Sequence, residues 1–162
     1  MAVTHLLLGS NVGDRKKNID KARSLVDERI GKVLKQSKIY QTEPWGERDQ
    51  EDFLNQALEI NTKLKPKKVL EKIAEIEKLM DREETYKWGP REIDIDILMY
   101  EDEMICEMDL TIPHPFLHER KFTLIPLSEI APDLYHPIMG ASILDLLLDC
   151  EDSLDVQEYK GK

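Results

Sequence analysis

The sequence predicts an α+β fold of the ferredoxin-like type, a mainly antiparallel sheet with the order β-α-β-β-α-β and small C-terminal helices. Two observations predict it: four stretches are apolar or alternate as strands do, and two stretches with apolar residues at helical spacing separate them. This order places both helices on one face of the sheet and leaves the other face open for a ligand. No repeat or low-complexity linker interrupts the 162 residues, so we expect one domain over residues 1–162.

The first part of the chain predicts a strand, a helix and a second strand. Residues 3–8 are short and apolar, as in a buried strand, and a tight turn at Gly9-Ser10-Asn11 follows. Asp14 is a suitable N-cap for a helix whose apolar residues recur at helical spacing up to Gly31. The weaker alternation of residues 33–42 indicates the second strand.

The next part predicts the third strand, the second helix and the fourth strand. Residues 53–64 alternate, which places Phe53 and Asn55 on the face opposite the aliphatic side chains. Pro66 occupies the first position of the helix, where proline is well tolerated. The apolar stripe of this helix consists of Val69, Leu70, Ile73, Ile76 and Met80. Residues 93–98 alternate again and form the fourth strand.

The C-terminal part predicts only small elements. Residues 104–106 and 110–112 are suited to a hairpin, and residues 116–130 are largely helical with an interruption at Pro126. Ser142 is a suitable N-cap for a last short helix. From about residue 151 to 162 the chain is polar, and we expect a loosely held tail.

The fourth strand carries the residues with the most chemical content. In an extended chain its isoleucines point to one side, while Asp94 and Asp96 point to the other. The two carboxylates are then roughly 7 Å apart at Cα and repel each other unless a cation lies between them. Mg²⁺ prefers oxygen ligands, so the pair is a candidate metal site. Taken alone, such a pair is more often simply the water-facing side of a half-exposed strand, and the residues before the strand favour the metal site.

The residues before this strand are suited to nucleotide chemistry. Gly89-Pro90 turns the chain, Arg91 supplies a forked cation and Trp88 supplies a flat apolar face. Carboxylates for a metal beside a guanidinium for phosphate are typical of phosphoryl transfer. The string K-W-G-P-R-E-I-D-I-D-I-L, residues 87–98, closely resembles the signature of the 6-hydroxymethyl-7,8-dihydropterin pyrophosphokinases of the folate pathway, and the resemblance extends roughly over residues 3–138.

The resemblance implies an enzyme that transfers the terminal diphosphate of ATP to the hydroxymethyl group of the dihydropterin and releases AMP. It implies two Mg²⁺ ions held by Asp94 and Asp96, and catalytic roles for these two residues with Arg82 and Arg91. The ATP-binding residues that it implies are Arg82, Trp88, Arg91, Ile97, Thr111, His114 and Arg120, the last within the motif P-H-P-F-L-H-E-R-K-F of residues 113–122. The pterin-binding residues that it implies are Thr42, Pro44, Trp45, Phe53, Asn55, Asp94 and Phe122.

Each of these residues also has a simpler interpretation. Surface arginines are usually solvated, and their ion pairs are worth about 0–1 kcal/mol. His114 could instead cap a loop, and the aromatic residues could belong to the core. For a flat bicyclic substrate, however, aromatic faces and an amide that donates and accepts, such as Asn55, are the groups that binding requires.

Composition narrows the function classes and leaves two rivals. The net charge of −10 argues against nucleic acid as a partner, and the absence of an apolar run near 18 residues argues against a membrane span. Cys106 and Cys150 lack metal-ligand spacing and fit a reducing cytoplasm, where we expect a monomer. The rivals are a ferredoxin-like module that binds a small ligand without catalysis, and a two-metal phosphohydrolase, for which a third strong ligand is not evident.

Overall fold

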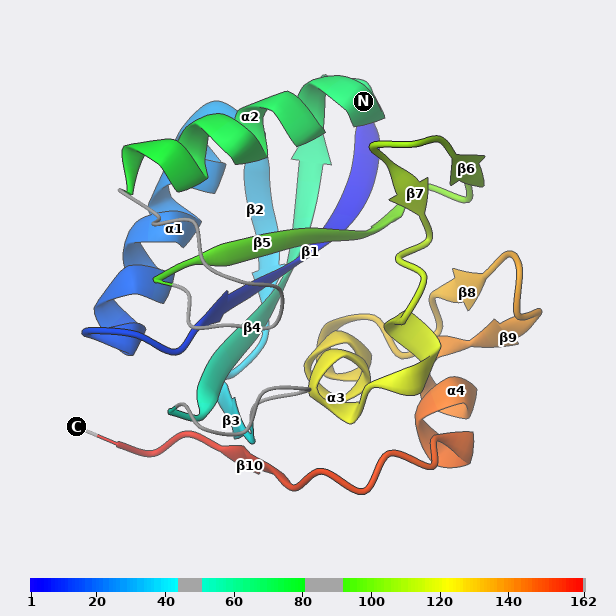
Figure 1. Cartoon of the computed structure of the whole chain (residues 1–162). Coiled ribbons are helices and arrows are strands. Elements are labelled where there is room, and N and C mark those ends of the chain that lie inside the picture. Colours follow the sequence, from blue (N-terminus) through cyan, green and yellow to red (C-terminus); the bar gives the residue numbers. More distant parts are fainter. Residues whose placement is uncertain (44–50, 81–91, 162) are drawn as a thin grey trace.

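The principal sheet has six strands and confirms the predicted ferredoxin-like α+β class (Figure 1). The computed structural model describes residues 1–43, 51–80 and 92–161. The strand order is β10-β3-β4-β1-β5, with β2 also paired to β4, and all of these pairs are antiparallel. The strands are β1 (Ala2–Ser10), β2 (Lys32–Gln36), β3 (Tyr40–Thr42), β4 (Phe53–Thr62), β5 (Asp94–Tyr100) and β10 (Val156–Glu158).

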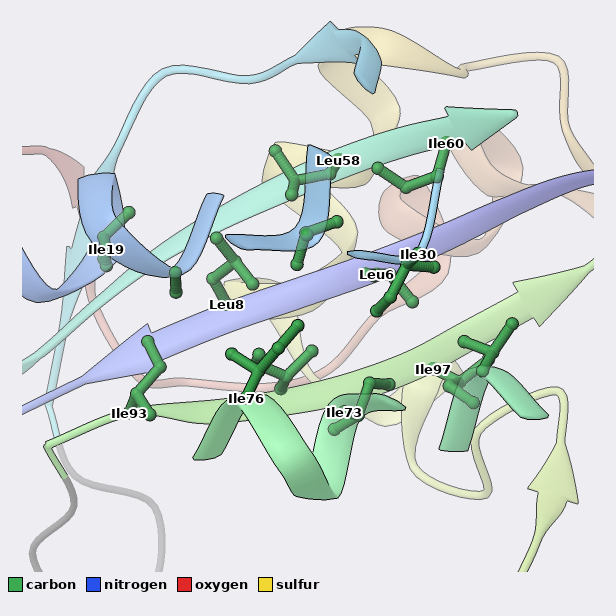
Figure 2. Close-up of a cluster of buried hydrophobic side chains, with 14 of the residues drawn as sticks. Leu6, Leu8, Ile19, Ile30, Leu58, Ile60, Ile73, Ile76, Ile93 and Ile97 are labelled. Carbon is green, nitrogen blue, oxygen red and sulfur yellow. The ribbon is translucent and has the colours of Figure 1, made fainter. Parts of the chain in front are cut away.

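Helices α1 (Arg15–Arg29) and α2 (Pro66–Leu79) cover one face of this sheet. Asp14 caps α1 as predicted, since its carboxylate accepts the Lys17 N–H at 3.2 Å. The predicted apolar faces of both helices meet the aliphatic side chains of β1, β4 and β5, and Figure 2 shows the resulting core. Its members include Leu6, Leu8, Ile19, Val26, Leu58, Ile60, Ile73, Ile76, Ile93 and Ile97.

The predicted second strand is divided into β2 and β3, both of which pair with β4. The division occurs at Ser37, which is buried. The Ser37 N–H donates to the Ala57 carbonyl and the Ser37 hydroxyl accepts the Ala57 N–H, each at 3.0 Å. The hydroxyl therefore replaces a backbone acceptor, and the strand bends without leaving a buried donor unpaired.

The opposite face is covered over only part of its length. Helices α3 (Lys121–Ile130) and α4 (Ile143–Asp149) pack there with a 3-10 turn, η1 (Leu117–Glu119), over the strand residues Leu7, Ala57 and Met99. Two hairpins complete the fold. The predicted one, β6 (Ile105–Cys106) with β7 (Thr111–Ile112), contacts β5 through β7, and an additional one, β8 (Tyr135–His136) with β9 (Ala141–Ser142), contacts α4 through β9.

The expected interruption of the helix at Pro126 is wrong. Pro126 lies inside α3, and the break occurs at Arg120, whose backbone is extended with φ −126° and ψ 114°. Ser142 caps α4 as predicted, because its hydroxyl accepts the Asp145 N–H at 3.1 Å. Within the described ranges, no helix has the length and apolar character needed to cross a membrane.

The expectation of a loosely held C-terminal tail is also wrong. Residues Val156–Glu158 form β10, an edge strand on β3 with Val156 opposite Thr42. Leu154 is buried, and the Tyr159 N–H donates to the Ile39 carbonyl at 2.8 Å. The polar composition of this segment reflects its position at an edge, where only alternate side chains are covered.

Candidate active site

The two predicted metal ligands lie on β5, on the sheet face away from α1 and α2. Ile95 and Ile97 are 5% and 6% exposed within the core, whereas Asp94 and Asp96 are half-buried on the other side. The predicted alternation of this strand is therefore confirmed. Asp94 lies directly opposite Gly9 of β1, and Asp96 lies opposite Leu7.

A row of directly paired residues connects the acids to the predicted pterin side. Gly9 pairs with Asp94 on one side and with Asn55 of β4 on the other, so the three residues cross the sheet on the same face. A Cβ atom at Gly9 would lie 2.8 Å from Asn55 Nδ2 and 3.7 Å from Phe53 Cδ1. Glycine therefore leaves room for the Asn55 side chain, whose Nδ2 donates to the Leu8 carbonyl at 3.3 Å.

Two buried oxygens on this side have no hydrogen-bond partner among the described residues. They are Asn55 Oδ1 and Thr42 Oγ1. Leaving a buried acceptor unsatisfied costs about 1–3 kcal/mol, so such atoms in a site call for a ligand or water. Thr42 lies opposite Phe53 in the β3–β4 pair, which places both oxygens beside an aromatic face.

Arg120 contacts a predicted pterin-binding ring and interacts electrostatically with both acids. Its guanidinium carbon is 4.7 Å from the ring centroid of Phe116 and 5.3 Å from that of Phe122, and the residue is 6% exposed. Burial lowers the pKa of Arg120, and the carboxylates of Asp96 and Asp94 oppose this shift. An arginine keeps its charge under such a shift, so a cation faces the two acids and stacks on two aromatic rings.

His114 is held in one tautomer beside Asp96. Its backbone N–H donates to the Leu98 carbonyl at 2.9 Å, and its Nδ1 accepts the Phe116 N–H at 3.1 Å. The neutral ring therefore carries its proton on Nε2, which lies 3.9 Å from Asp96 Oδ2. Burial first, and then the charge of Arg120, lower the pKa of His114 to about 4. His114 thus caps its loop with one nitrogen and presents a donor with the other.

This shift predicts a pH dependence of stability. The pKa of His114 is about 4 in the folded protein and 6.5 in the unfolded chain. Unfolding therefore takes up a proton at pH values between these two. The contribution is intact above pH 6.5 and is lost as the pH falls toward 4, about 2 kcal/mol of it between pH 7.5 and pH 5. We expect His114→Gln to show a smaller loss of unfolding free energy than the parent over this range in urea titrations.

The comparison of the two proteins isolates His114. Burial also lowers the pKa of His5 and His136, and these residues act equally in the parent and the variant. An identical pH dependence in both proteins would show that His114 is not held neutral.

Glu77 of α2 supports β5, a role that the sequence did not predict. From α2, its carboxylate accepts a hydrogen bond of 3.0 Å from the N–H of Ile95, the residue between the two acids. The backbone groups of alternate residues on β5 therefore face the outer edge of the sheet, those of Ile97 included. Because the Ile97 side chain is in the core, a nucleotide would reach this residue only through its backbone. The only sequence signal was an acidic residue within an apolar helical stripe.

The remaining predicted residues divide into two groups. Thr111 lies in β7 opposite Cys106. The other five, Pro44, Trp45, Arg82, Trp88 and Arg91, lie outside the described residues. Within the part of the chain that the structure describes, no group of three His, Cys, Asp or Glu side chains is placed to hold a metal ion. The Asp94–Asp96 pair fits Mg²⁺ only if waters or phosphate oxygens complete the shell, which is usual for this ion.

Comparison with known proteins finds relatives over most of the chain. The family model of 7,8-dihydro-6-hydroxymethylpterin-pyrophosphokinase (HPPK) matches residues 5–132. The 2-amino-4-hydroxy-6-hydroxymethyldihydropteridine pyrophosphokinase of Aquifex aeolicus is 49% identical over 138 residues, which are 85% of this chain and 86% of that protein. The enzyme of the same name from Bacillus subtilis is 43% identical over 129 residues, 79% of this chain and 77% of that protein.

A solved structure shares the fold. The crystal structure of HPPK-DHPS from Plasmodium falciparum superposes with a TM-score of 0.75 at 19% identity. The superposition covers 91% of this chain and 43% of that one, so this chain spans less than half of the longer protein. The family match and the two enzymes settle the assignment that the motif of residues 87–98 suggested: the chain belongs to the 7,8-dihydro-6-hydroxymethylpterin-pyrophosphokinase family.

Proposed function

We propose that the protein transfers the terminal diphosphate of ATP to the hydroxymethyl group of 6-hydroxymethyl-7,8-dihydropterin, giving the pterin diphosphate and AMP in folate biosynthesis. One observation carries this proposal. The row Asp94–Gly9–Asn55 places a pair of acids and a partly unsatisfied amide on the same sheet face, with the buried Arg120 guanidinium facing the acids.

The pterin is expected to lie over Gly9, where no side chain rises from the sheet. The unsatisfied Asn55 Oδ1 would accept an N–H from the ring edge, and Thr42 Oγ1, on β3 opposite Phe53, would make a second polar contact. Phe53 and Phe122 supply aromatic faces, the second held by the cation of Arg120. Pro44 and Trp45 remain predicted members of this pocket.

The nucleotide is expected on the β5 side. Asp94 and Asp96 would hold Mg²⁺, for which we propose two ions, with Arg120 and the His114 Nε2–H directed at phosphate oxygens. When bound, Mg²⁺ neutralises phosphate charge and lowers the pKa of a coordinated hydroxyl. Ile97 would contribute through its backbone, with Thr111 nearby on β7. Arg82, Trp88 and Arg91 remain predicted ligands of ATP, and Arg82 and Arg91 remain predicted catalytic residues.

The chain's own groups act mainly by position and charge. The hydroxymethyl oxygen attacks the β-phosphorus, the bond to the oxygen shared with the α-phosphorus breaks, and AMP leaves with that oxygen. Arg120 stabilises the negative charge that accumulates on the phosphates in the transition state. His114 acts as a donor and not as the base, since its Nδ1 is occupied and its low pKa keeps it neutral, so the hydroxyl proton passes to solvent.

Mass analysis of the products tests the proposal. The protein incubated with Mg²⁺, ATP and 6-hydroxymethyl-7,8-dihydropterin should yield AMP and the pterin diphosphate in equal amounts. ADP with a pterin monophosphate would mean transfer of a single phosphate. Inorganic phosphate as the main product would favour a phosphohydrolase, and binding without any product would favour a ligand-binding module.

Truncating the aromatic face of α3 should separate the two substrates. We expect Phe122→Ala to raise the Kd of the pterin about tenfold, because it removes one aromatic face, and to raise that of ATP about twofold at most. Isothermal titration with each ligand measures both constants. Ile125→Ala, on the same helix and also half-buried, is a matched control with little expected effect on either ligand. Equal weakening of both ligands by Phe122→Ala would instead assign Phe122 to the core.

We further propose that the protein acts as a monomer in the cytoplasm. Cys106 and Cys150 are free thiols, as is usual in a reducing compartment. Sedimentation at micromolar concentration would test the monomeric state.

A further inference from the structure

The C-terminal segment contacts three elements that carry predicted pterin-binding residues. We define residues 151–160 as the C-terminal strap. From the end of α4 it passes α3 and then pairs with β3 (Figure 1). We propose that the strap positions the pterin side of the active site, with Asp152 and Tyr159 as its positioning residues. This inference rests on the proposed function and assigns a role to a segment that the reaction itself does not use.

The first contact of the strap fixes the start of α3. The Asp152 carboxylate accepts the N–H of Lys121, the first residue of that helix, at 3.0 Å. The N-cap residue Arg120 has no side-chain cap bond, as expected of a side chain that only donates. A distant carboxylate therefore supplies the helix cap and also favours the positive end of the helix dipole. Phe122 follows Lys121 directly, so the orientation of its ring depends on this first turn.

The middle of the strap fixes β3. Val156 lies opposite Thr42, and Leu154 is buried at 8% exposure. The Tyr159 N–H then donates to the Ile39 carbonyl at 2.8 Å. Without the strap, β3 would be a three-residue edge strand with its outer backbone groups unpaired, a poor support for the buried hydroxyl of Thr42.

The far end of the strap fixes the start of β4 through Arg15. The guanidinium carbon of Arg15 lies 5.8 Å from the ring centroid of Tyr159, and its Nη1 donates to the Asp52 carbonyl at 2.8 Å. Asp52 also accepts a hydrogen bond from Gln41 Nε2 through its carboxylate at 3.0 Å. Asp52 immediately precedes Phe53, the other predicted aromatic face. Tyr159 therefore positions the Arg15 guanidinium, which in turn fixes the Asp52 carbonyl next to Phe53.

These three contacts lie next to Phe122, Thr42 and Phe53, respectively, and none of them involves β5. The strap should thus influence the pterin more than the nucleotide. Asp152 could also influence the nucleotide, because its charge acts on Arg120 and opposes the lowering of the Arg120 pKa. Tyr159 has no such connection, so it provides the cleaner test.

The experiment compares Asp152→Ala and Tyr159→Ala, each in the 162-residue chain, with the parent and with Asp155→Ala. Asp155 lies in the same strap with the same charge, but its carboxylate bonds only to Gln157 among the described residues, so it is a matched control. The pterin Kd is measured by titration at saturating non-hydrolysable ATP analogue, and the Kd of that analogue is measured alone. Thermal unfolding followed by circular dichroism verifies that each variant folds.

We expect Asp152→Ala and Tyr159→Ala each to raise the pterin Kd about fivefold or more, the effect of losing one hydrogen bond or stacked pair. Each should change the nucleotide Kd less than about twofold. Asp155→Ala should match the parent. Asp152→Asn keeps a side-chain oxygen for the Lys121 N–H and should recover most of the affinity. Tyr159→Phe keeps the ring beside Arg15 and should also recover most of the pterin affinity. If Asp152→Ala does not fold, the comparison of Tyr159→Ala with Tyr159→Phe tests the inference.

Two results would overturn the inference. One is an unchanged pterin Kd in both Tyr159→Ala and Asp152→Ala; the other is an equal rise of the pterin and nucleotide constants. If the parent protein itself binds no pterin, the proposed function and this inference both fail. Normal pterin binding by the parent and by every variant overturns the inference alone.

Discussion

Replacing Asp96 by alanine is expected to lower Mg²⁺-dependent formation of AMP and pterin diphosphate about thousandfold, or roughly 4 kcal/mol of transition-state stabilisation. The reason is geometric. Asp94 and Asp96 are the only predicted metal ligands, and the described residues gather no group of three such side chains that could hold the ion. One carboxylate cannot align the phosphates in the way that a pair on the same strand face can. Single-turnover assays with saturating ATP and pterin measure the change.

Folding should survive the Asp96→Ala substitution. The Asp96 side chain is 32% exposed, and its removal relieves repulsion with Asp94, which offsets part of the lost attraction to Arg120, so the unfolding free energy should change little. Asp102→Ala is the control: it removes an exposed acid just beyond the other end of β5 and should retain parent activity. Turnover near the parent rate in Asp96→Ala would refute the metal assignment.

The second large effect is expected at Arg120. Arg120→Lys keeps the charge but loses the planar fork and the stacking on Phe116 and Phe122. Because this guanidinium is buried and faces both acids, we expect turnover to fall about hundredfold, with weaker binding of both ATP and pterin. The effect on pterin arises because Arg120 also holds the ring of Phe122. Steady-state kinetics with each substrate varied in turn separates the two contributions.

The exposed Arg29 at the end of α1 gives a matched control, and Arg29→Lys should behave as the parent. If Arg120→Lys retained turnover within about twofold, the stacked guanidinium would be a structural group without a role at the phosphates. A loss confined to the pterin KM, with an unchanged kcat, would restrict Arg120 to supporting Phe122.

Local patterns predicted the elements whose signal is contained in a few consecutive residues. The alternation at residues 93–98 placed Asp94 and Asp96 on the ligand face, and the apolar spacing of α1 and α2 identified their buried sides. Side-chain caps such as Asp14 were equally visible, since a cap and its helix are adjacent in sequence. Other candidate ligand residues, such as His114 and Arg120, came from the resemblance to a family and not from periodicity.

Features that depend on distant partners could not be predicted in this way. The strap looked like a polar tail because its strand is stabilised by β3, more than 110 residues earlier in the chain. The break at Arg120 leaves the Lys121 N–H to the carboxylate of Asp152, which lies 31 residues later in the chain, so no local pattern marked it. Glu77 gained its role only when α2 packed beside β5 and its carboxylate met the Ile95 N–H.

The number of divalent ions that the protein binds with nucleotide tests the central claim most directly. Mn²⁺ can replace Mg²⁺ at oxygen-ligand sites and its free form is counted by electron paramagnetic resonance. With a non-hydrolysable ATP analogue, the parent should hold two Mn²⁺ ions per chain, and Asp96→Ala should lose at least one while still folding. The same count in both proteins would contradict the assignment of the paired aspartates as the metal ligands of this enzyme.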